Sequence, residues 1–350
     1  MCGLTGYLSA SVTGTEQDMH ALLRPMADAI RHRGPDSDGF WVDTSNGIGL
    51  AHRRLAIVDL SAAGHQPMAS VSGRYVLAFN GEIYNHMGLR DELRRAGAAP
   101  QWRGHSDTET LLAGIDTWGL QGTLQRCIGM FAIALWDRQS RSLTLARDRM
   151  GEKPLYYGWQ RRGNISAFLF GSELKALRAH PSFEGDVDRD ALALLLRHNY
   201  IGAPHSIYKG LLKLQPGHLL QVSLAHPDPV LTSYWDACHA ILSGTQQRFT
   251  GSAADAAVQL EALLKDAIGQ QMVADVPLGA FLSGGVDSSA IVALMQTLSS
   301  RPVKTFSIGF NDESYDEAPF AKVVAKHLGT EHTELYVSAE QAMSVIPKLP

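Results

Sequence analysis

The 350-residue sequence has few cysteines and no long apolar run. Its three cysteines, Cys2, Cys127 and Cys238, form no C-x-x-C pair, which argues against a disulfide framework or a structural zinc site and for a reducing compartment. Apolar runs such as residues 130–136 and 191–196 are far shorter than the ~20 residues of a membrane-spanning helix. Because the first twenty residues also lack the basic and apolar regions of a signal peptide, we expect a cytoplasmic location and no membrane partner.

The chain also lacks an excess of charge of either sign. It contains 31 Lys and Arg against 35 Asp and Glu, which gives a formal net charge of −4 at pH 7. A general nucleic-acid-binding surface is therefore not expected. With 45% hydrophobic and 19% charged residues, the composition is that of a globular protein, and the length favours two domains.

The first part of the chain mixes two kinds of pattern. Residues 2–180 contain several β-type runs separated by turn signals, together with helical stretches near 17–31 and 86–96. This combination predicts a layered α+β domain. Residues 181–253 are more polar and are interpreted as a linker region, with a helix near 188–197 and a short strand in HLLQVSL.

A different pattern begins at residue 254. A long helical run is followed by the β-type segments VPLGAFL, VKTFSIGF and HTELYV, which alternate with helices over 288–299 and 317–328. Gly329 stands where a helix C-cap glycine is expected. Strands that alternate with helices predict a parallel sheet with right-handed crossovers, so residues 254–350 are predicted to form an α/β domain.

The stretch FLSGGVDSSAIVAL, residues 281–294, has the pattern of an anion-binding loop. An apolar strand ends at Leu282, and a glycine-containing loop leads into a helix, whose N-terminal amides favour phosphate. Ser283 and Ser288 can donate further hydrogen bonds, and Asp287 can hold a Mg²⁺ ion. The loop matches neither the Walker-type nor the dinucleotide-binding glycine pattern. The simpler interpretation is a capped helix after a tight turn.

Cys2 stands directly behind the initiator methionine. In one interpretation it is a small apolar residue at the start of a strand in which Cys2, Leu4, Gly6 and Leu8 share a face. In the other, removal of Met1 gives it a free α-amino group, with a pKa of about 7.7–8.0 beside a thiol of about 8.5. That amine can then accept the thiol proton and activate Cys2 as a nucleophile.

Four further motifs decide between these interpretations: RHRGPD at 31–36, AHRRLAIVD at 51–59, NGEIYN at 80–85 and SDTE at 106–109. Their order and spacing resemble those of class II glutamine amidotransferases. The loop at 283–288 resembles the pyrophosphatase loop S-G-G-x-D-S of the ATP-pyrophosphatase superfamily. Over most of residues 2–350 the chain is similar to glutamine-hydrolysing asparagine synthetases. The resemblance implies an N-terminal-nucleophile amidohydrolase sandwich followed by a parallel-sheet synthetase domain.

The same residues fit the chemistry of a glutamine site. Arg54 can bind the carboxylate in a bidentate pair, with the main chain of Ile57 and Val58 close by, and Glu82 and Asp107 can bind the ammonium group. By the resemblance, Cys2 is the nucleophile, and the Asn80 side chain and the Gly81 N–H bind the oxyanion. The resemblance also implies that ATP is bound by Leu282, Ser283, Gly284, Gly285, Asp287, Ser288 and Ile308, with Mg²⁺ at Asp287.

Several of these residues also have simpler interpretations. Asn80-Gly81 is the strongest dipeptide signal for a hairpin turn, and Arg54 can form an ordinary surface ion pair. Asp107 can be the N-cap of the helix that follows it, and Ile308 can belong to the core of its sheet.

The resemblance implies a reaction in which glutamine supplies ammonia, ATP adenylates a carboxylate, most often aspartate, and ammonia displaces AMP. The acceptor can also be another carboxylate, such as a sugar acid. Two other classes stay open: a glutaminase or regulatory glutamine-binding protein with an inactive synthetase half, and an enzyme similar to β-lactam synthetases. We find no second motif of the S-G-x-G-x-D-E type before Pro350, so we expect a truncated synthetase domain. The family leads us to expect a homodimer.

Overall fold

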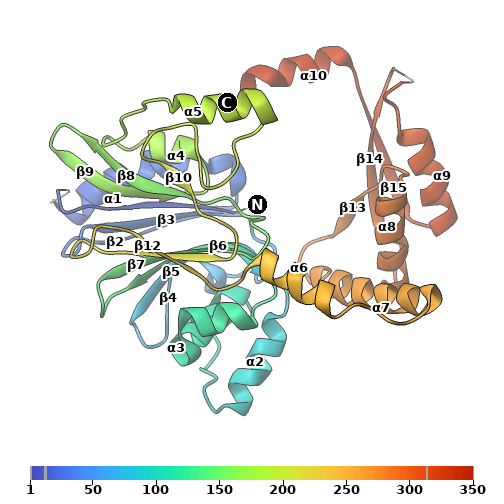
Figure 1. Cartoon of the computed structure of the whole chain (residues 1–350), viewed down its shortest axis with the longest axis horizontal. Helices are drawn as coiled ribbons and strands as arrows, with labels where there is room; N and C mark the ends of the chain where they lie inside the picture. Colours follow the sequence, from blue (N-terminus) through green and yellow to red (C-terminus); the bar gives the residue numbers. More distant parts are fainter. Residues whose placement is uncertain (1, 12–13, 313, 350) are drawn as a thin grey trace. The chain divides into compact units, whose positions relative to one another are not determined.

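The computed structural model describes residues 2–11, 14–312 and 314–349. The chain forms two compact units, Met1–Gln247 and Arg248–Pro350 (Figure 1). Each unit is described separately below. No helix among the described residues has the length and apolar character needed to cross a membrane.

The described residues of the first unit form two antiparallel sheets of six strands each. In the first sheet the strand order is β10-β8-β9-β1-β3-β2, and in the second it is β12-β11-β7-β6-β5-β4. The strands of the first sheet are β1 (Gly3–Leu8), β2 (Ser37–Asp43), β3 (Ile48–Arg54), β8 (Tyr156–Arg162), β9 (Ile165–Gly171) and β10 (Leu212–Lys213). Those of the second are β4 (Met68–Ala69), β5 (Tyr75–Ile83), β6 (Gly129–Asp137), β7 (Ser142–Arg147), β11 (His218–Val222) and β12 (Val230–Ser233).

The two sheets pack face to face, and helices cover both outer faces (Figure 1). Helices α1 (Glu16–Asp28) and α4 (Leu174–Arg178) pack on the first sheet, and α2 (His86–Arg95) and α3 (Asp107–Arg126) pack on the second. The central strands of each sheet, such as β1 and β6, are therefore buried on both faces. This arrangement confirms the predicted layered α+β architecture.

Strand β1 shows how the sequence produces these layers. Leu4 and Leu8 belong to the core between the sheets, whereas Tyr7 packs on the other side in the core that includes α1. Successive side chains of a strand point to opposite faces, so one strand contributes to two cores. The predicted alternation of β1 is confirmed.

The interpretation of residues 181–253 as a linker is corrected by the structure. Helix α5 (Arg189–His198) and strand β11 confirm the two predicted elements of this region. However, β10 pairs with β8 in the first sheet, while β11 and β12 extend the second sheet beside β7. The first unit therefore continues through α6 (Ala237–Gln246) and ends at Gln247. Short 3₁₀ turns occupy η1 (Arg31–Arg33), η2 (Ala62–Gly64) and, in the second unit, η3 (Ile346–Lys348).

The second unit is built on a parallel sheet in the order β13-β14-β15, as predicted. Its strands are β13 (Gly279–Phe281), β14 (Lys304–Phe310) and β15 (Glu331–Val337), and its helices are α7 (Ala253–Gln271), α8 (Val286–Leu298), α9 (Ala318–Leu328) and α10 (Ala339–Val345). Gly329 ends α9 in the left-handed conformation. Ile308 is 49% exposed, so its interpretation as a sheet-core residue is wrong.

Candidate active site

One pocket of the first unit collects residues from the ends of several strands and from the start of α3. All the residues that the sequence assigns to glutamine binding and hydrolysis line it: Cys2, Arg54, Ile57, Val58, Asn80, Gly81, Glu82 and Asp107. The sequence analysis missed the rest of the lining: Leu55, Gly64, Gln66, Phe79, Ser106, Thr108, Met130 and Lys153. The pocket therefore joins motifs that are far apart in the chain.

Cys2 lies in this pocket rather than in the apolar core. Its Sγ lies 3.4 Å from the carbonyl oxygen of Leu55, and the Leu55 N–H donates to the same sulfur at 3.3 Å. Burial raises the pKa of the Cys2 thiol, and the Leu55 N–H partly offsets this effect. A reactive thiolate in this position therefore requires a base to remove the proton.

The main chain of Cys2 is held by an arginine that the sequence analysis did not assign. Arg33 Nε donates to the Cys2 carbonyl oxygen at 2.9 Å, and its Nη1 donates to Glu173 at 2.8 Å. Burial of the Arg33 side chain, which is 9% exposed, keeps this geometry fixed. Arg33 belongs to the RHRGPD motif, so the motif itself was the available signal.

Arg54 is held by main-chain oxygens. Its guanidinium donates to the carbonyl oxygens of Asp59 and, at 3.0 Å, Ser61. A guanidinium has five N–H donors, which leaves others for a carboxylate in the pocket. In the part of the chain that the structure describes, no carboxylate is paired with Arg54, so the surface ion-pair interpretation is not supported.

Asn80 and Gly81 lie inside β5, opposite Ala132 and Phe131 of β6. The hairpin interpretation of this dipeptide is therefore wrong, because sheet pairing overrides the local turn preference. The Phe79 N–H donates to Gln66 at 2.7 Å and the Ile83 N–H donates to Asp107 at 2.9 Å. Since N–H groups two residues apart in a strand point to the same side, the Gly81 N–H also points to the side of the strand away from β6.

Asp107 is buried and is not the N-cap of α3. The N-cap is Ser106, whose side chain accepts from the Glu109 N–H at 3.3 Å. The Asp107 carboxylate instead accepts from the N–H groups of Ile83 and Thr108. Burial raises the pKa of Asp107 despite these bonds. The helix-cap interpretation of this residue is therefore corrected.

Glu82 is the second carboxylate of the pocket. Its partial burial and the nearby Asp107 carboxylate raise its pKa to about 7, while the positive charge of Lys153 acts in the opposite direction. The charge of each carboxylate therefore disfavours ionisation of the other, and a cationic ligand between them would stabilise both charges. This electrostatic environment suits an ammonium group.

Lys153 reaches the pocket from a turn that follows β7. The Asp148 carboxylate accepts from the N–H groups of Met150, Glu152 and Lys153 at 2.9–3.1 Å. Arg147 Nε donates to the Lys153 carbonyl oxygen at 2.8 Å. Burial, with the positive charge of Arg33, lowers the pKa of the Lys153 ammonium. The charged run RDRMGEK gave no sign that its lysine is 5% exposed.

The second unit has a separate pocket beside β13 and β14, lined by residues that include Leu282, Ser283, Ser288 and Ile308. Ser283 Oγ lies 2.9 Å from Ser288 Oγ and accepts from the Gly285 N–H at 3.3 Å. Helix α8 begins at Val286, so Asp287 and Ser288 lie in its first turn, directly after Gly284 and Gly285. This arrangement is consistent with phosphate binding at the N-terminus of α8.

Comparisons with known proteins agree with this geometry. Residues 1–235 match the family described as "Glutamine amidotransferase domain", and residues 259–350 match the family described as "Asparagine synthase". The first match includes the strands β10 to β12 that the linker interpretation left out. The sandwich and its cysteine pocket thus define a glutamine amidotransferase domain.

Two curated relatives extend the comparison over the whole chain. A protein of Mycobacterium bovis named "Putative asparagine synthetase [glutamine-hydrolyzing]" is 36% identical, with an alignment that covers 100% of this chain and 54% of that protein. One of Methanocaldococcus jannaschii named "Putative asparagine synthetase [glutamine-hydrolyzing] 2" is 32% identical over 99% of this chain and 67% of that protein. The chain belongs to the family of glutamine-hydrolysing asparagine synthetases.

The chain spans about half the length of the first of these relatives. Among solved structures, one titled "Structure of the allosteric regulatory enzyme of purine biosynthesis" matches with a TM-score of 0.50 and 14% identity. The match covers 96% of this chain and 80% of that one. At this identity the likeness shows a shared fold alone.

Proposed function

We propose that this protein hydrolyses glutamine at Cys2 and uses the ammonia to convert aspartate to asparagine, with ATP cleaved to AMP and pyrophosphate. One observation carries the first half of the proposal: Cys2 and the residues chosen from three distant motifs for glutamine binding and hydrolysis line a single pocket. Family membership and the serine-glycine loop before α8 support the second half.

In the proposed complex, glutamine lies between the two charged ends of the pocket. Arg54 binds the α-carboxylate, with the main chain of Ile57 and Val58 beside it. Glu82 and Asp107 bind the α-ammonium group. This leaves the side-chain amide of glutamine next to Cys2.

Hydrolysis then proceeds through two steps. Once Met1 is removed, the α-amino group of Cys2 takes the thiol proton, and Sγ attacks the amide carbon. The C–N bond breaks, the nitrogen takes a proton and leaves as ammonia, and a γ-glutamyl thioester remains. Water then attacks the thioester carbon, which releases glutamate and returns the thiol.

The oxyanion of each tetrahedral intermediate is stabilised by Gly81 N–H and the Asn80 amide. Asn80 Nδ2 donates to Ser172 Oγ at 3.4 Å, and among the described residues the buried Asn80 Oδ1 has no hydrogen-bond partner. Ser172 Oγ also accepts from the Leu4 N–H, so we propose the reversed amide orientation, in which the Ser172 hydroxyl donates to the Asn80 Oδ1. In that orientation the Asn80 NH₂ group is the donor available to the oxyanion.

In the second unit, the proposal places the ATP phosphates at the loop formed by Ser283, Gly284, Gly285 and Ser288. Asp287 is exposed in the first turn of α8, and one carboxylate together with phosphate oxygens is a usual donor set for Mg²⁺. Asp287 is therefore the residue that would hold the ion. When bound, Mg²⁺ would neutralise charge on the phosphates.

The test measures both halves of the reaction with the purified full-length protein, because the 350-residue sequence spans only about half of the first relative. Mass spectrometry should show loss of Met1, and glutamate should form from glutamine in the wild type but not in Cys2→Ala. With aspartate, ATP and Mg²⁺ added, asparagine and AMP should form in equal amounts. Glutamate without asparagine, or AMP formation only with another acceptor such as a sugar acid, would refute the aspartate assignment. Hydrolysis by a chain that retains Met1 would refute the N-terminal mechanism.

A further inference from the structure

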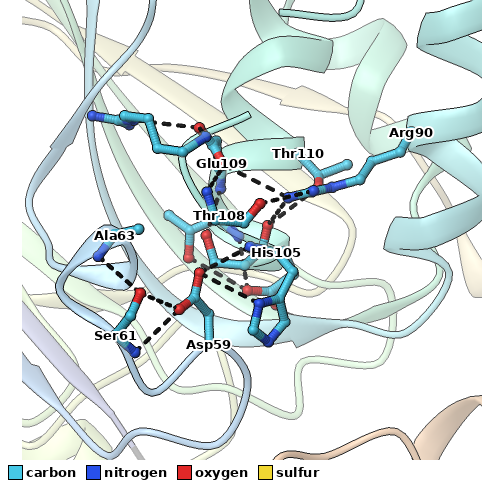
Figure 2. A network of polar contacts seen from close by, with 12 residues as sticks. Asp59, Ser61, Ala63, Arg90, His105, Thr108, Glu109 and Thr110 are labelled. Atoms are coloured by element: carbon cyan, nitrogen blue, oxygen red, sulfur yellow. Dashed lines mark hydrogen bonds and ion pairs between the residues drawn. The ribbon is translucent and has the colours of Figure 1, made fainter. Parts of the chain in front are cut away.

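Asp59 ends the AHRRLAIVD motif but does not line the pocket. It is 1% exposed, and its backbone adopts a left-handed φ of 58°. Its Oδ1 accepts from the Ser61 N–H at 3.1 Å and from the Ser61 hydroxyl at 2.5 Å, while its Oδ2 accepts from the His105 N–H at 2.9 Å (Figure 2). Burial opposes the charge, but these bonds outweigh it and hold the pKa of Asp59 below its usual range.

On one side, Asp59 shapes the turn that holds Arg54. The carbonyl oxygens of Asp59 and Ser61 both accept from the Arg54 guanidinium, and the Asp59 carboxylate fixes the turn between them. The turn is closed by Gly64, where an added Cβ would lie 2.1 Å from Arg54 Nη2. The position of the guanidinium therefore depends on the conformation of residues 59–64.

On the other side, Asp59 contacts the loop that leads into Asp107. His105, whose N–H donates to Asp59, precedes Asp107 by two residues. At Gly104 an added Cβ would lie 2.0 Å from Asp59 Oδ2, so only glycine allows this close approach. The carboxylate thus sits directly against the backbone of the loop.

The loop itself is rigidly built (Figure 2). The Glu109 carboxylate accepts from the N–H groups of Arg103 and Gly104 at 2.9 and 3.2 Å. Arg90, which is 4% exposed, donates to the carbonyl oxygens of Gly104 and Ser106, each at 3.0 Å. A shift of Asp59 relative to this loop would therefore be a shift relative to Asp107.

We propose that Asp59 is a positioning residue that sets the distance between Arg54 and Asp107, and thereby the fit of the two charged ends of glutamine. This inference rests on the proposed glutamine site. It deepens that proposal because Asp59 does not line the pocket and would act through the two loops that its carboxylate joins. The nucleophile lies directly before β1, with its sulfur against the main chain of Leu55, and the oxyanion donors lie within β5, so a change in the Asp59 turn should affect the charged ends of glutamine more than the reacting amide.

The critical variant is Asp59→Asn. Asparagine has the same shape and tolerates a left-handed backbone, but its NH₂ group must face either Ser61 or His105, both of which donate to the native carboxylate. One donor–donor contact results, and the two loops separate. Because displacements of about 1 Å can cost ~10²-fold, we expect the KM for glutamine to rise about 10- to 100-fold while kcat changes less than about threefold.

Asp137→Asn is the matched control. The Asp137 carboxylate also accepts two main-chain N–H groups, those of Gln139 and Ser140, but in the turn between β6 and β7, away from the pocket lining. Ser61→Ala is a milder second variant, which removes the hydroxyl bond to Asp59 and the bond that Ser61 Oγ accepts from the Ala63 N–H, but leaves the Asp59 carboxylate in place. Thermal melts of all variants report folding, and we expect Asp137→Asn to keep the wild-type KM.

A double-mutant cycle tests the route of the effect. If Asp59 acts through Arg54, then Asp59→Asn should change kcat/KM much less in an Arg54→Ala background than in the wild type. Additive effects would overturn the inference, as would an unchanged KM in Asp59→Asn and Ser61→Ala, or equal losses in the Asp137→Asn control. Absence of glutamine hydrolysis by the wild type would instead refute the proposed function.

Discussion

The raised pKa of Glu82 leads to a prediction about the pH dependence of glutamine hydrolysis. Burial and the neighbouring Asp107 place this pKa at about 7, and the proposed role in ammonium binding requires the ionised form. With that pKa, about nine tenths of Glu82 is charged at pH 8 and about one tenth at pH 6. Since kcat/KM reports the free enzyme, Glu82 alone should reduce it about tenfold between these two pH values.

The α-amino group of Cys2 titrates in the same range, with an ordinary pKa of about 7.7–8.0, so a single profile would mix the two groups. The comparison with Glu82→Gln separates the two groups, because this variant keeps the titrating amine but has a neutral amide in place of the titrating carboxylate. The ratio of wild-type to Glu82→Gln kcat/KM should therefore fall about tenfold from pH 8 to pH 6. Glutamate release at constant ionic strength provides the assay.

Lys153 supplies a second check on the same reasoning. Its positive charge lowers the Glu82 pKa, so Lys153→Met should move this part of the profile to higher pH. Lys213→Met removes another partly buried lysine, one that donates to the Ile201 carbonyl and does not line the pocket, and should leave the profile in place. A constant wild-type to Glu82→Gln ratio between pH 8 and pH 6 would show that Glu82 does not bind the ammonium group as a carboxylate.

Three further outcomes test separate parts of the two units. Ser172→Ala should lower kcat about tenfold with little change in KM, because it releases the Asn80 amide from its orienting bond; an unchanged kcat would contradict the proposed amide orientation. Arg54→Ala should chiefly raise the KM for glutamine, since the carboxylate is bound equally in the ground and transition states, and steady-state kinetics in which only kcat falls would oppose this role. Asp287→Ala should abolish aspartate-dependent AMP formation while glutamine hydrolysis continues, and loss of both activities would show that the effect is not confined to nucleotide binding.

Much of the candidate site was predictable because its residues carry chemistry that is visible in the sequence. A thiol behind Met1, an arginine and two carboxylates are the groups that bind and cleave glutamine, and each occurs in a short motif. Asn80-Gly81 was the hardest case, because the local signal for a hairpin was strong. Its placement inside β5 results from the pairing of nine residues with β6. This interaction is non-local, so it cannot be predicted from the turn preference of a dipeptide.

The same reason explains the error in residues 181–253. Strands β10 and β12 have two and four residues, too few to show an alternating pattern, and β10 pairs with Tyr156 and Tyr157 more than fifty residues earlier. Such strands are stabilised by the sheet edge that they join rather than by their own composition. A polar, irregular segment can therefore complete a sheet and still have the sequence pattern of a linker.

The residues that hold the site in place were missed for a different physical reason. Arg33, Asp59, Asp148 and Lys153 are charged, and charged residues usually lie on the surface. Three of these side chains are bound mainly to the main chain: Arg33 donates to the Cys2 carbonyl, Asp59 accepts from two loops, and Asp148 accepts from the turn that presents Lys153. Every non-proline residue offers the same main-chain N–H and carbonyl groups, so the partner sequence gives no signal for such bonds. Substrate-binding side chains can therefore be recognised by their chemistry. Arg33 and Asp59 also lie in the sequence motifs, but their positioning roles are identified only once the fold brings distant main-chain segments together.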